Sequence, residues 1–292
     1  MRLILSRKGL DSSFGKTPSP ILPDGRLCWL PIPEINHAKP RLPTYGQLQY
    51  ADRNLGELLE ELSRGAIPQT TPVHLDPELS PRWLNHGDDW RPLFGQTGAP
   101  ERHLRNEGVT TGDIFLFFGW FRQTEEGPAG VRFVPGAPDL HVIYGWMQIH
   151  QRSANDLFTT WPETLSHHPH IQGSSYGALD TLYTASENLS AIDRPDLPGA
   201  GLFGGIEQQL VLTMPGSSRS CWLLVRDFLP QGRPPMSFHS DPARWHEIDD
   251  EHVRLRAANR GQEFVLDLDH YPGVHDWLRQ EVFTHATKDP DV

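Results

Sequence analysis

Residues 112–151 constrain the fold more strongly than any other part of this 292-residue chain. Two long runs rich in aromatic and β-branched residues begin at Gly112 and at Leu140, with a short third run between them. Turn-forming stretches rich in glycine and proline separate the runs, and this pattern predicts a core β-meander. Ile114 to Phe118 are apolar at every position, so both faces of that strand should be buried. We therefore expect this strand at the centre of a sheet.

A few helices and several further strands complete the predicted elements. Four leucines between Asn54 and Arg64 fall at helical spacing, and Asn54 can cap the helix. Further strands are predicted at 3–5, 26–31, 180–186, 207–214, 221–226 and 263–269. An amphipathic helix follows the last of them, so that residues 263–283 form a C-terminal strand and helix. Residues 66–111 are predicted to be mostly loop, with a short helix around His103.

These elements predict a single elaborated α+β domain over residues 1–292. Strands predominate, in a barrel-like or strongly bent mixed sheet with a few peripheral helices. The 27 prolines and 26 glycines favour many loops over long helices.

The formal net charge of −11 limits the range of partners. Such a chain is a poor candidate for salt-driven binding to long duplex nucleic acid, although it can bind a nucleotide, one extruded base or a protein. Two cysteines give no disulfide framework, and no apolar run suits a signal peptide or a membrane span. We expect a soluble, cytoplasmic protein.

A loop that follows the first predicted strand is a candidate phosphate site. It combines cations, a glycine and small hydroxyl residues, and its candidate binding residues are Arg7, Lys8, Ser12 and Ser13. The loop lacks the Gly-Lys-Ser/Thr ending of a P-loop. The alternative is an ordinary surface loop in which Asp11 makes a local turn bond.

Several of the 15 histidines lie two residues from another histidine or an aspartate. On an extended backbone such residues point to the same face, so each pair could offer two ligands to one metal. The candidate ligands are His74, Asp76, His141, His168 and His170. Two histidines and one carboxylate with open positions are typical of non-haem iron, so iron is favoured over zinc and manganese.

A structural interpretation stands beside the metal hypothesis. Pairs of this kind arise by chance in a chain rich in histidine and aspartate, and no His-Glu-x-x-His or Cys-x-x-Cys frame links them. Asp76 could cap the turn at Pro77, and residues 167–170 could form a solvated loop.

Aromatic residues in the meander are candidates for stacking on a base. Trp120 and Trp146 each lie beside a glycine, and Tyr144 lies close to Trp146 in the sequence. Such a grouping can form a stacking slot, and it can equally be part of a hydrophobic core. No Gly-x-Ser-x-Gly elbow is present, so a hydrolase triad has no support.

Seven sequence blocks carry a family resemblance. They are Leu3–Ser13, Pro18–Ile21, His74–Pro77, Gly112–Phe121, Asp139–Trp146, His168–His170 and Arg260–Val265. As a set they resemble the nucleotide modification associated domain family, type three, over nearly the whole chain. That family is named for its association with enzymes that modify bases in DNA or free nucleotides. The resemblance therefore implies a role in nucleotide modification and leaves the reaction open.

The resemblance also marks the polar positions of the family on this sequence. They are Asp11, His74, Asp76, His103, Asp139, His141, His168, His170 and Glu263. Among them Asp11, His103 and Glu263 are the expected catalytic residues. Leu10 stands where an aromatic residue is expected, and Asp11 is still in place.

The first and last strands of the meander are separately similar to the core of PUA-like barrels, which read modified bases. This similarity covers about forty residues and rests on the Gly112-Asp turn and on the Ile143-Tyr-Gly segment.

Two function hypotheses follow. The first is a metal-dependent enzyme, with a divalent metal as cofactor, that acts on a nucleotide, a base or a small polar substrate. The alternative is a PUA-like module that recognises a modified base without catalysis. A third interpretation is an interaction protein whose histidine-rich loops are solvated. The expected partners are a nucleotide or modified base and other nucleic-acid-modifying enzymes.

Overall fold

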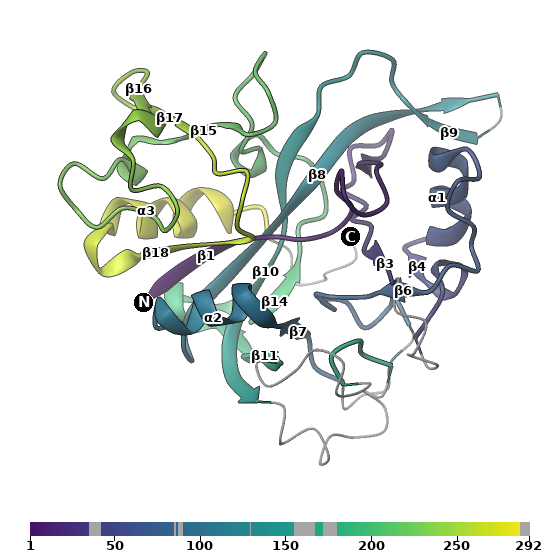
Figure 1. Ribbon diagram of the computed structural model, residues 1–292, viewed down its shortest axis with the longest axis horizontal. Coiled ribbons are helices and arrows are strands. Elements are labelled where there is room, and N and C mark those ends of the chain that lie inside the picture. Colours follow the sequence, from purple (N-terminus) through teal and green to yellow (C-terminus); the bar gives the residue numbers. More distant parts are fainter. Residues whose placement is uncertain are drawn as a thin grey trace.

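A mixed, bent sheet runs through the centre of the molecule (Figure 1). The computed structural model describes residues 1–34, 42–84, 86, 90–128, 130–154, 167–171 and 180–286. Along its main path, the sheet contains β18 (Glu263–Asp267), β1 (Arg2–Arg7), β8 (Ile114–Gly127), β10 (Leu140–Ala154), β11 (Thr181–Ala185) and β7 (Leu93–Gln96). Three shorter strands lie off this path: β14 (Ala200–Leu202) pairs with β10, and β2 (Ser19–Ile21) and β9 (Gly130–Phe133) pair with β8.

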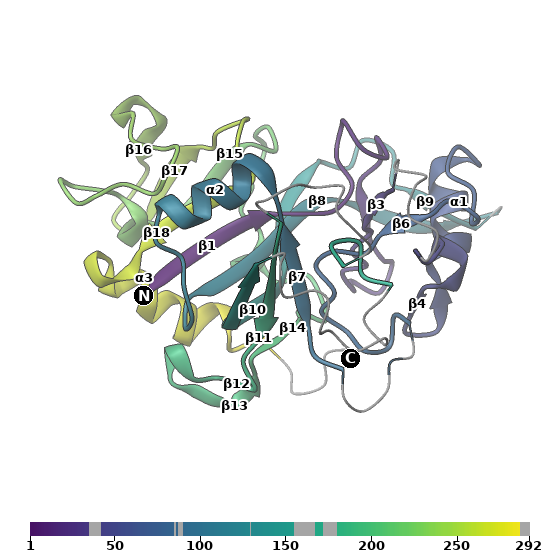
Figure 2. The same cartoon turned by 60° about the horizontal axis from the view of Figure 1, so that its bottom comes forward.

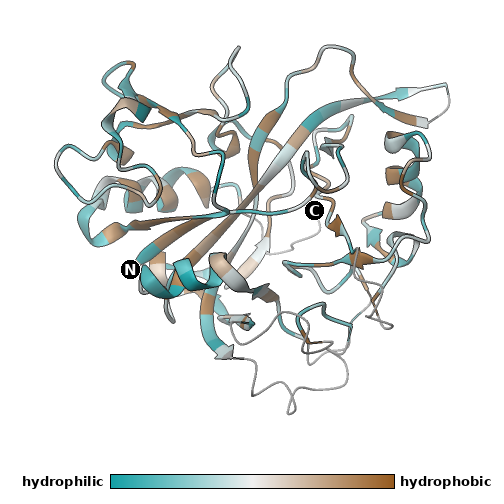
Figure 3. Ribbon diagram, in the orientation of Figure 1, coloured by the Kyte–Doolittle hydropathy of each residue, from teal (hydrophilic) through white to brown (hydrophobic). Residues whose placement is uncertain are grey.

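The prediction of a predominantly β, strongly bent mixed sheet is confirmed, and among the described residues the sheet does not close into a barrel. β8 is its central strand, as the sequence predicts. Residues Ile114 to Phe118 have no exposed surface, and β8 pairs in parallel with β1 on one edge and antiparallel with β10 on the other. Hydrophobic residues concentrate on these central strands (Figure 3).

The meander prediction is wrong in its pairing. β9 pairs only with the far end of β8, where Thr124 faces Phe133, and β10 returns to pair directly with β8. A short hairpin therefore extends the end of β8, and the two long strands lie side by side. Cross-strand contacts between their apolar side chains, such as Met147 opposite Phe115, stabilise this pairing.

A looped-out segment positions the candidate site. β1 and β2 both pair in parallel with the edge of β8 that β10 leaves open. Arg7 faces Phe118, and Ser19 faces Phe121, only three positions further along β8. The chain between Arg7 and Ser19 is much longer than this gap, so residues 8–18 must leave the sheet and return to it.

The helices lie around the sheet. α1 (Leu55–Ser63) is the predicted helix, and the side chain of Asn54 accepts hydrogen bonds from the Gly56 and Glu57 amides at its start. α2 (Gly98–Asn106) lies beside β1 (Figures 1 and 2). α3 (Pro272–Trp277) continues into a π-helical segment, Leu278–Val282, and this pair is the predicted final helix.

Small sheets occupy the two ends of the molecule (Figures 1 and 2). At one end, β15 (Cys221–Val225), β17 (His252–Arg256) and β16 (Trp245–Glu247) form a three-stranded accessory sheet. At the other end, β3 (Ile32–Pro33) pairs with β6 (Val73–His74), and β4 (Gln49–Tyr50) pairs with β5 (Arg53–Asn54). A further pair is formed by β12 (Asn188–Leu189) and β13 (Arg194–Pro198).

Three sequence predictions are corrected here. Residues 26–31 and 207–214 make isolated bridges in place of strands, because their backbones follow turns and a 3₁₀ segment, Gln208–Leu210. The supposed long loop at 66–111 contains β6, β7 and α2. Among the described residues, no helix is long and apolar enough to cross a membrane.

A buried histidine couples this fold to pH. His239 has no exposed surface, and its Nε2 accepts a hydrogen bond from the Ala258 amide while Nδ1 lies 2.7 Å from the Ser237 carbonyl oxygen. Burial, together with the charge of Arg244, outweighs the Ser237 contact and lowers the pKa of His239 to about 4. The folded chain therefore holds this ring neutral at a pH where the unfolded chain protonates it.

We expect the free energy of unfolding to fall as pH drops from about 6.5 to 4, by up to ~3 kcal/mol from His239. The sign follows because the unfolded state binds the extra proton in that window. His239→Gln should flatten the pH dependence measured by urea denaturation. His246→Gln, at an exposed position on β16, is the matched control and should keep the parent's slope. Equal slopes for parent and His239→Gln would contradict the assignment.

Candidate functional site

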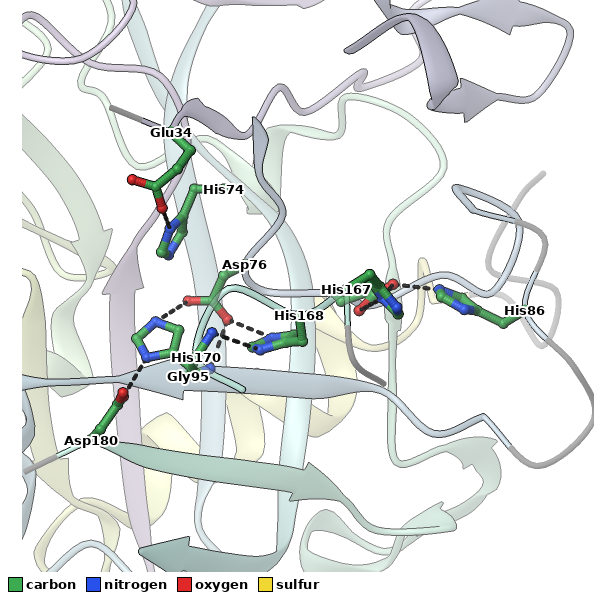
Figure 4. Close-up of polar contacts among 10 residues, drawn as sticks. Glu34, His74, Asp76, His86, Gly95, His167, His168, His170 and Asp180 are labelled. Atoms are coloured by element: carbon green, nitrogen blue, oxygen red, sulfur yellow. Dashed lines mark hydrogen bonds and ion pairs between the residues drawn. The ribbon is translucent and has the colours of Figure 1, made fainter. Parts of the chain in front are cut away.

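An extended segment that begins at β6 presents alternate polar side chains to one side. His74 and Asp76 alternate with Leu75, which is buried in the core, and Glu78 follows the bend at Pro77. Across from them lies the described turn 167–171, which contributes three histidines (Figure 4). Two clusters that could hold a metal result: His74 with Asp76 and His170, and Glu78 with His86 and His167.

The first cluster, here called the metal triad, consists of His74, Asp76 and His170. One candidate ligand atom from each residue lies within 4.8 Å of the other two. Nδ1 of His170 is 2.6 Å from Oδ1 of Asp180, and Nδ1 of His74 is 3.1 Å from Oε2 of Glu34. Each imidazole is thus held by a carboxylate at Nδ1, which leaves Nε2 as the atom suited to a metal. Nε2 of His170 already lies 3.7 Å from Asp76 Oδ2.

Asp76 is fixed from several directions. Its Oδ1 accepts a hydrogen bond of 2.7 Å from the Gly95 amide and lies 3.5 Å from Nε2 of His168. Nδ1 of His168 accepts a hydrogen bond from the His170 amide, so in the neutral ring the proton resides on Nε2, which faces Asp76. Burial alone would raise the pKa of Asp76, but His168 and the neighbouring histidines outweigh it and lower that pKa to about 2.

His168 was expected as a ligand, and it lies outside the metal triad. Its Nε2 contacts Asp76 Oδ1 at 3.5 Å without a hydrogen bond. His141, also expected as a ligand, lies on β10 and belongs to neither cluster among the described residues.

Gly95 on β7 allows the triad to assemble. A Cβ at this position would lie 2.2 Å from Cδ2 of His170, a distance that real side chains do not tolerate. Because Gly95 has no side chain, the His170 ring can lie against β7. The Gly95 amide also donates a hydrogen bond to Asp76.

The second cluster is built on a fully buried carboxylate. Both oxygens of Glu78 lie 3.0 Å from Nε2 of His167, and its Oε1 also hydrogen-bonds with Nε2 of His86. Burial alone would raise the pKa of Glu78, but these two histidines outweigh it and lower the pKa to about 2. The His86 ring stacks between His167 and Trp90.

A cavity of about 270 Å³ opens beside the metal triad. All three triad residues line it, as do the β7 residues Gly95 and Gln96. The looped-out segment supplies much of the remaining wall. The lining residues from that segment and from its neighbours include Arg7, Lys8, Asp11, Ser12, Ser13, Phe14, Trp120, His141 and Arg219. Glu78, His86 and His167 do not line it, so only the first cluster faces this cavity.

The part of the cavity formed by β1, β8 and β10 is cationic. Arg7 is anchored through Nη2 to the Gly261 carbonyl oxygen at 2.9 Å. The Arg219 guanidinium lies over the Trp120 ring, 4.3 Å from its centre. Lys8 is held by Glu263, whose Oε1 is 3.0 Å from Nζ. These three cations favour an anion in the cavity.

His141 adds a neutral hydrogen-bond donor to this region. Its Nδ1 accepts a hydrogen bond of 3.0 Å from Nε1 of Trp222, which can only donate. Burial and the charges of Arg219 and Arg7 hold the pKa of His141 well below its usual range. The ring is therefore neutral with its proton on Nε2, and that N–H can donate to a ligand in the cavity.

The three residues expected to be catalytic lie in three different environments. Asp11 makes the local turn bond of the alternative interpretation, accepting from the Ser13 and Phe14 amides, and still lines the cavity. Glu263 lies behind the wall, buried, where it binds Lys8 and accepts from Gln96. His103, on α2, hydrogen-bonds with Ser237 and does not line the cavity.

The three aromatic residues predicted to stack on a base lie in two different environments. Trp120 lines the cavity, and its Nε1 donates to Asp139. Tyr144 and Trp146 are buried in the core, where Tyr144 stacks on Trp29 and Trp146 packs against Phe203 and Phe283. Their rings cannot stack on a base in this arrangement because protein side chains already cover them.

Several site residues escaped sequence reasoning. They are Glu34, Glu78, His86, Asp180 and Arg219. Glu78 continues the i, i+2 spacing of His74 and Asp76, and that pattern could have indicated it. The others come from separate segments, and only the fold brings them to the site.

Comparison with known proteins gives one match. A family model described as nucleotide modification associated domain 3 matches residues 2–267, and it confirms the resemblance seen in the sequence. No curated protein and no solved structure matches the chain. The matched span contains the whole cavity wall and both clusters.

Gly95→Ala should lower the free energy of unfolding by about 1–3 kcal/mol, because its methyl group displaces the His170 ring. In a His170→Ala background the same change should have much less effect, so a double-mutant cycle measured by urea denaturation should give a coupling energy. Gly205→Ala is the control, since a new Cβ there has no neighbour closer than 3.4 Å. Additive effects in the cycle would refute the close approach.

Proposed function

The chain belongs to the nucleotide modification associated domain 3 family, and from this premise we propose that it is a metal-dependent enzyme acting on a nucleotide or a nucleobase. Family membership supports a general role in nucleotide modification. The metal and the catalysis are our proposal, argued from the residues of the cavity.

The observation that carries the proposal is the metal triad. Two histidines and one carboxylate converge at one point of the cavity wall, each imidazole backed at Nδ1 by a carboxylate (Figure 4). A carboxylate at Nδ1 is typical of metal-ligating histidines because it fixes the tautomer and raises the basicity of the other ring nitrogen. A purely structural ion-pair cluster needs no cavity beside it, whereas this one lines a space of about 270 Å³.

The donor set favours iron over zinc and manganese. Two imidazoles and one carboxylate on one face suit non-haem iron, and the cavity leaves room for substrate on the other side. A divalent metal held by these ligands would keep open coordination positions and would polarise a substrate oxygen as a Lewis acid.

The cationic region gives the substrate its orientation. Arg7, Lys8 and Arg219 would bind a phosphate, with the amides and hydroxyl groups of Ser12 and Ser13 at its edge. With the phosphate held there, the remainder of the nucleotide extends toward the metal triad. His141 would donate its Nε2 proton in a hydrogen bond to a substrate oxygen and stay neutral.

The three expected catalytic residues take different proposed roles. Asp11 lines the cavity and is the candidate general base. Glu263 acts through Lys8, whose ammonium it holds, and is a positioning residue. His103 is the weakest of the three because its ring contacts Ser237 and Phe238 outside this cavity.

The alternative, a binding module without catalysis, rests on Trp120. Its ring lines the cavity and carries Arg219 on one face, an arrangement that could hold a base next to a phosphate. This alternative accounts for the cations and leaves the metal triad unexplained, so the enzyme is preferred.

Elemental analysis of untagged protein, purified without chelator, tests the proposal. The parent should contain about one metal ion or more per chain, and His170→Ala should lose one ion because a ligand is missing. His86→Ala, in the second cluster, is the matched control and should keep the ion bound by the triad. Loss in His86→Ala with retention in His170→Ala would move the metal to the second cluster. If the parent contains no metal and binds none when iron is added, the metal-dependent enzyme is excluded and the binding module is favoured.

Asp180→Asn should weaken metal affinity about 10–100-fold without removing a ligand, since it disturbs the hydrogen bond that orients His170. Competition with a chromophoric chelator measures this affinity. Asp193→Asn, at an exposed carboxylate, provides the control and should match the parent. An unchanged affinity in Asp180→Asn would argue against His170 as a ligand.

A further inference from the structure

Three hollows join into one groove that starts at the metal triad. The cavity of about 270 Å³ is followed by a hollow of about 670 Å³, and the two share lining residues that include Arg7, Trp120 and Arg219. That hollow continues into a third, of about 590 Å³, through shared residues on the segments 217–220 and 257–259. Asn259 lines all three. The groove therefore runs from the central sheet to the accessory sheet of β15, β17 and β16.

The far end of this groove is strongly basic. Arg244, Arg254, Arg256 and Arg260 line it, and none of its described lining residues is acidic. The alternation of β17 explains two of them, because Val253 and Leu255 turn into the core and direct Arg254 and Arg256 to the outer face.

Among the described residues that line the middle of the groove, Asp139 is the one carboxylate, and the Arg122 guanidinium neutralises it. Oδ1 of Asp139 accepts hydrogen bonds from Nε and Nη2 of Arg122 at 2.8 and 2.6 Å, and from Nε1 of Trp120 at 2.8 Å. A series of cations thus extends through all three hollows, in a chain whose formal net charge is −11. A polyanion is repelled by the molecule as a whole and attracted along this one path.

Exposed aromatic rings stand at both ends of the same path. Among the described residues, only three large hydrophobic side chains are classed as exposed, and two of them, Phe14 and Phe238, line the groove. Phe238 is 46% exposed and has a φ of +64°, a left-handed backbone that a bulky side chain seldom adopts. The His103 ring supports it, with 4.5 Å between the ring centres. Such strain at an exposed ring is typical of a functional position.

We infer that this groove binds single-stranded nucleic acid and leads one of its bases to the metal triad. The arginines of the accessory sheet contact the backbone phosphates, and Phe238 is a platform on which an unpaired base stacks. Arg7 and Arg219 hold the phosphate next to the reacting nucleotide. This inference rests on the proposed function and specifies its substrate as single-stranded nucleic acid.

A strand fits the groove better than a free nucleotide or a duplex. A single nucleotide would engage the cations of the first cavity and leave the four arginines of the accessory sheet without a ligand. A duplex keeps its bases stacked on one another, so it offers no face to Phe14 or Phe238. Unpaired bases on a continuous phosphate backbone satisfy both the cations and the rings.

Fluorescence anisotropy with a labelled oligothymidylate of about 15 nucleotides tests the inference. The parent should bind the oligonucleotide in a salt-dependent manner and more tightly than a duplex of equal length. The Arg254→Ala, Arg256→Ala double variant should bind at least about tenfold more weakly, and the slope of log affinity against log salt should fall by about 0.7 per arginine removed. Both side chains lie at the surface, so the fold should persist.

The matched control is the Arg132→Ala, Arg279→Ala double variant. It removes the same charge at half-exposed or exposed positions outside the groove, and it should bind like the parent. Phe238→Ala should weaken oligothymidylate binding about fivefold or more while binding of heparin, a polyanion without bases, stays unchanged. A parent that does not bind the oligonucleotide, or equal losses in both double variants, would overturn the inference. Unchanged binding in Phe238→Ala would overturn the stacking platform.

The metal content of every variant separates this inference from the proposed function. None of the substituted residues belongs to the metal triad, so elemental analysis should give the parent's value. Failure to bind a strand with the metal retained would refute the groove and leave the enzyme. Binding of the oligonucleotide by a protein that contains no metal would support the groove and count against the metal-dependent enzyme.

Discussion

The pairing of β8 on both edges is the constraint on which the rest of the structure depends. Its apolar residues are covered on both faces, and its hydrogen-bonding groups are taken up by β1 on one edge and by β10 on the other. β2 then rejoins the β1 edge only three positions beyond Arg7, which forces residues 8–18 out of the sheet. The cavity exists because this segment cannot lie flat. Arg7 and Lys8 reach it because they are the last residue of β1 and the first of the loop.

Buried carboxylates organise the other part of the site. Asp76 and Glu78 lie in a nearly dry environment, where an unpaired negative charge would be strongly destabilising. Histidines from the turn 167–171 compensate them, and the same contacts orient those histidines. Glu34 and Asp180 in turn contact the Nδ1 atoms of His74 and His170. The same polar contacts therefore stabilise the buried carboxylates and orient the histidine rings.

The distribution of charge links the site to its surroundings. Carboxylates surround the metal triad, whereas arginines follow the groove away from it toward the accessory sheet. A metal and an anionic substrate would thus each meet the opposite charge at a different position along one path. The accessory sheet, which contributes nothing to the triad, would be the distal part of the proposed nucleic-acid-binding groove.

The sequence by itself determined the elements whose pattern is local. The apolar run of Ile114–Phe118 required a central strand, the leucine spacing after Asn54 required α1, and the i, i+2 spacing of His74 and Asp76 placed two candidate ligands on one side. It also indicated Arg7 and Lys8 as candidate phosphate-binding residues, and both line the cavity. Only the tertiary structure decided which histidine completes the triad, since His168 and His170 both direct Nε2 toward Asp76 and only His170 also groups with His74. Tertiary packing likewise buried Tyr144 and Trp146, left Trp120 at the cavity, and brought Arg219 and Asp180 to it from distant segments. The physical reason is that a local pattern fixes the direction of a side chain relative to its own strand, whereas its partners depend on which strands pair and where loops must leave the sheet.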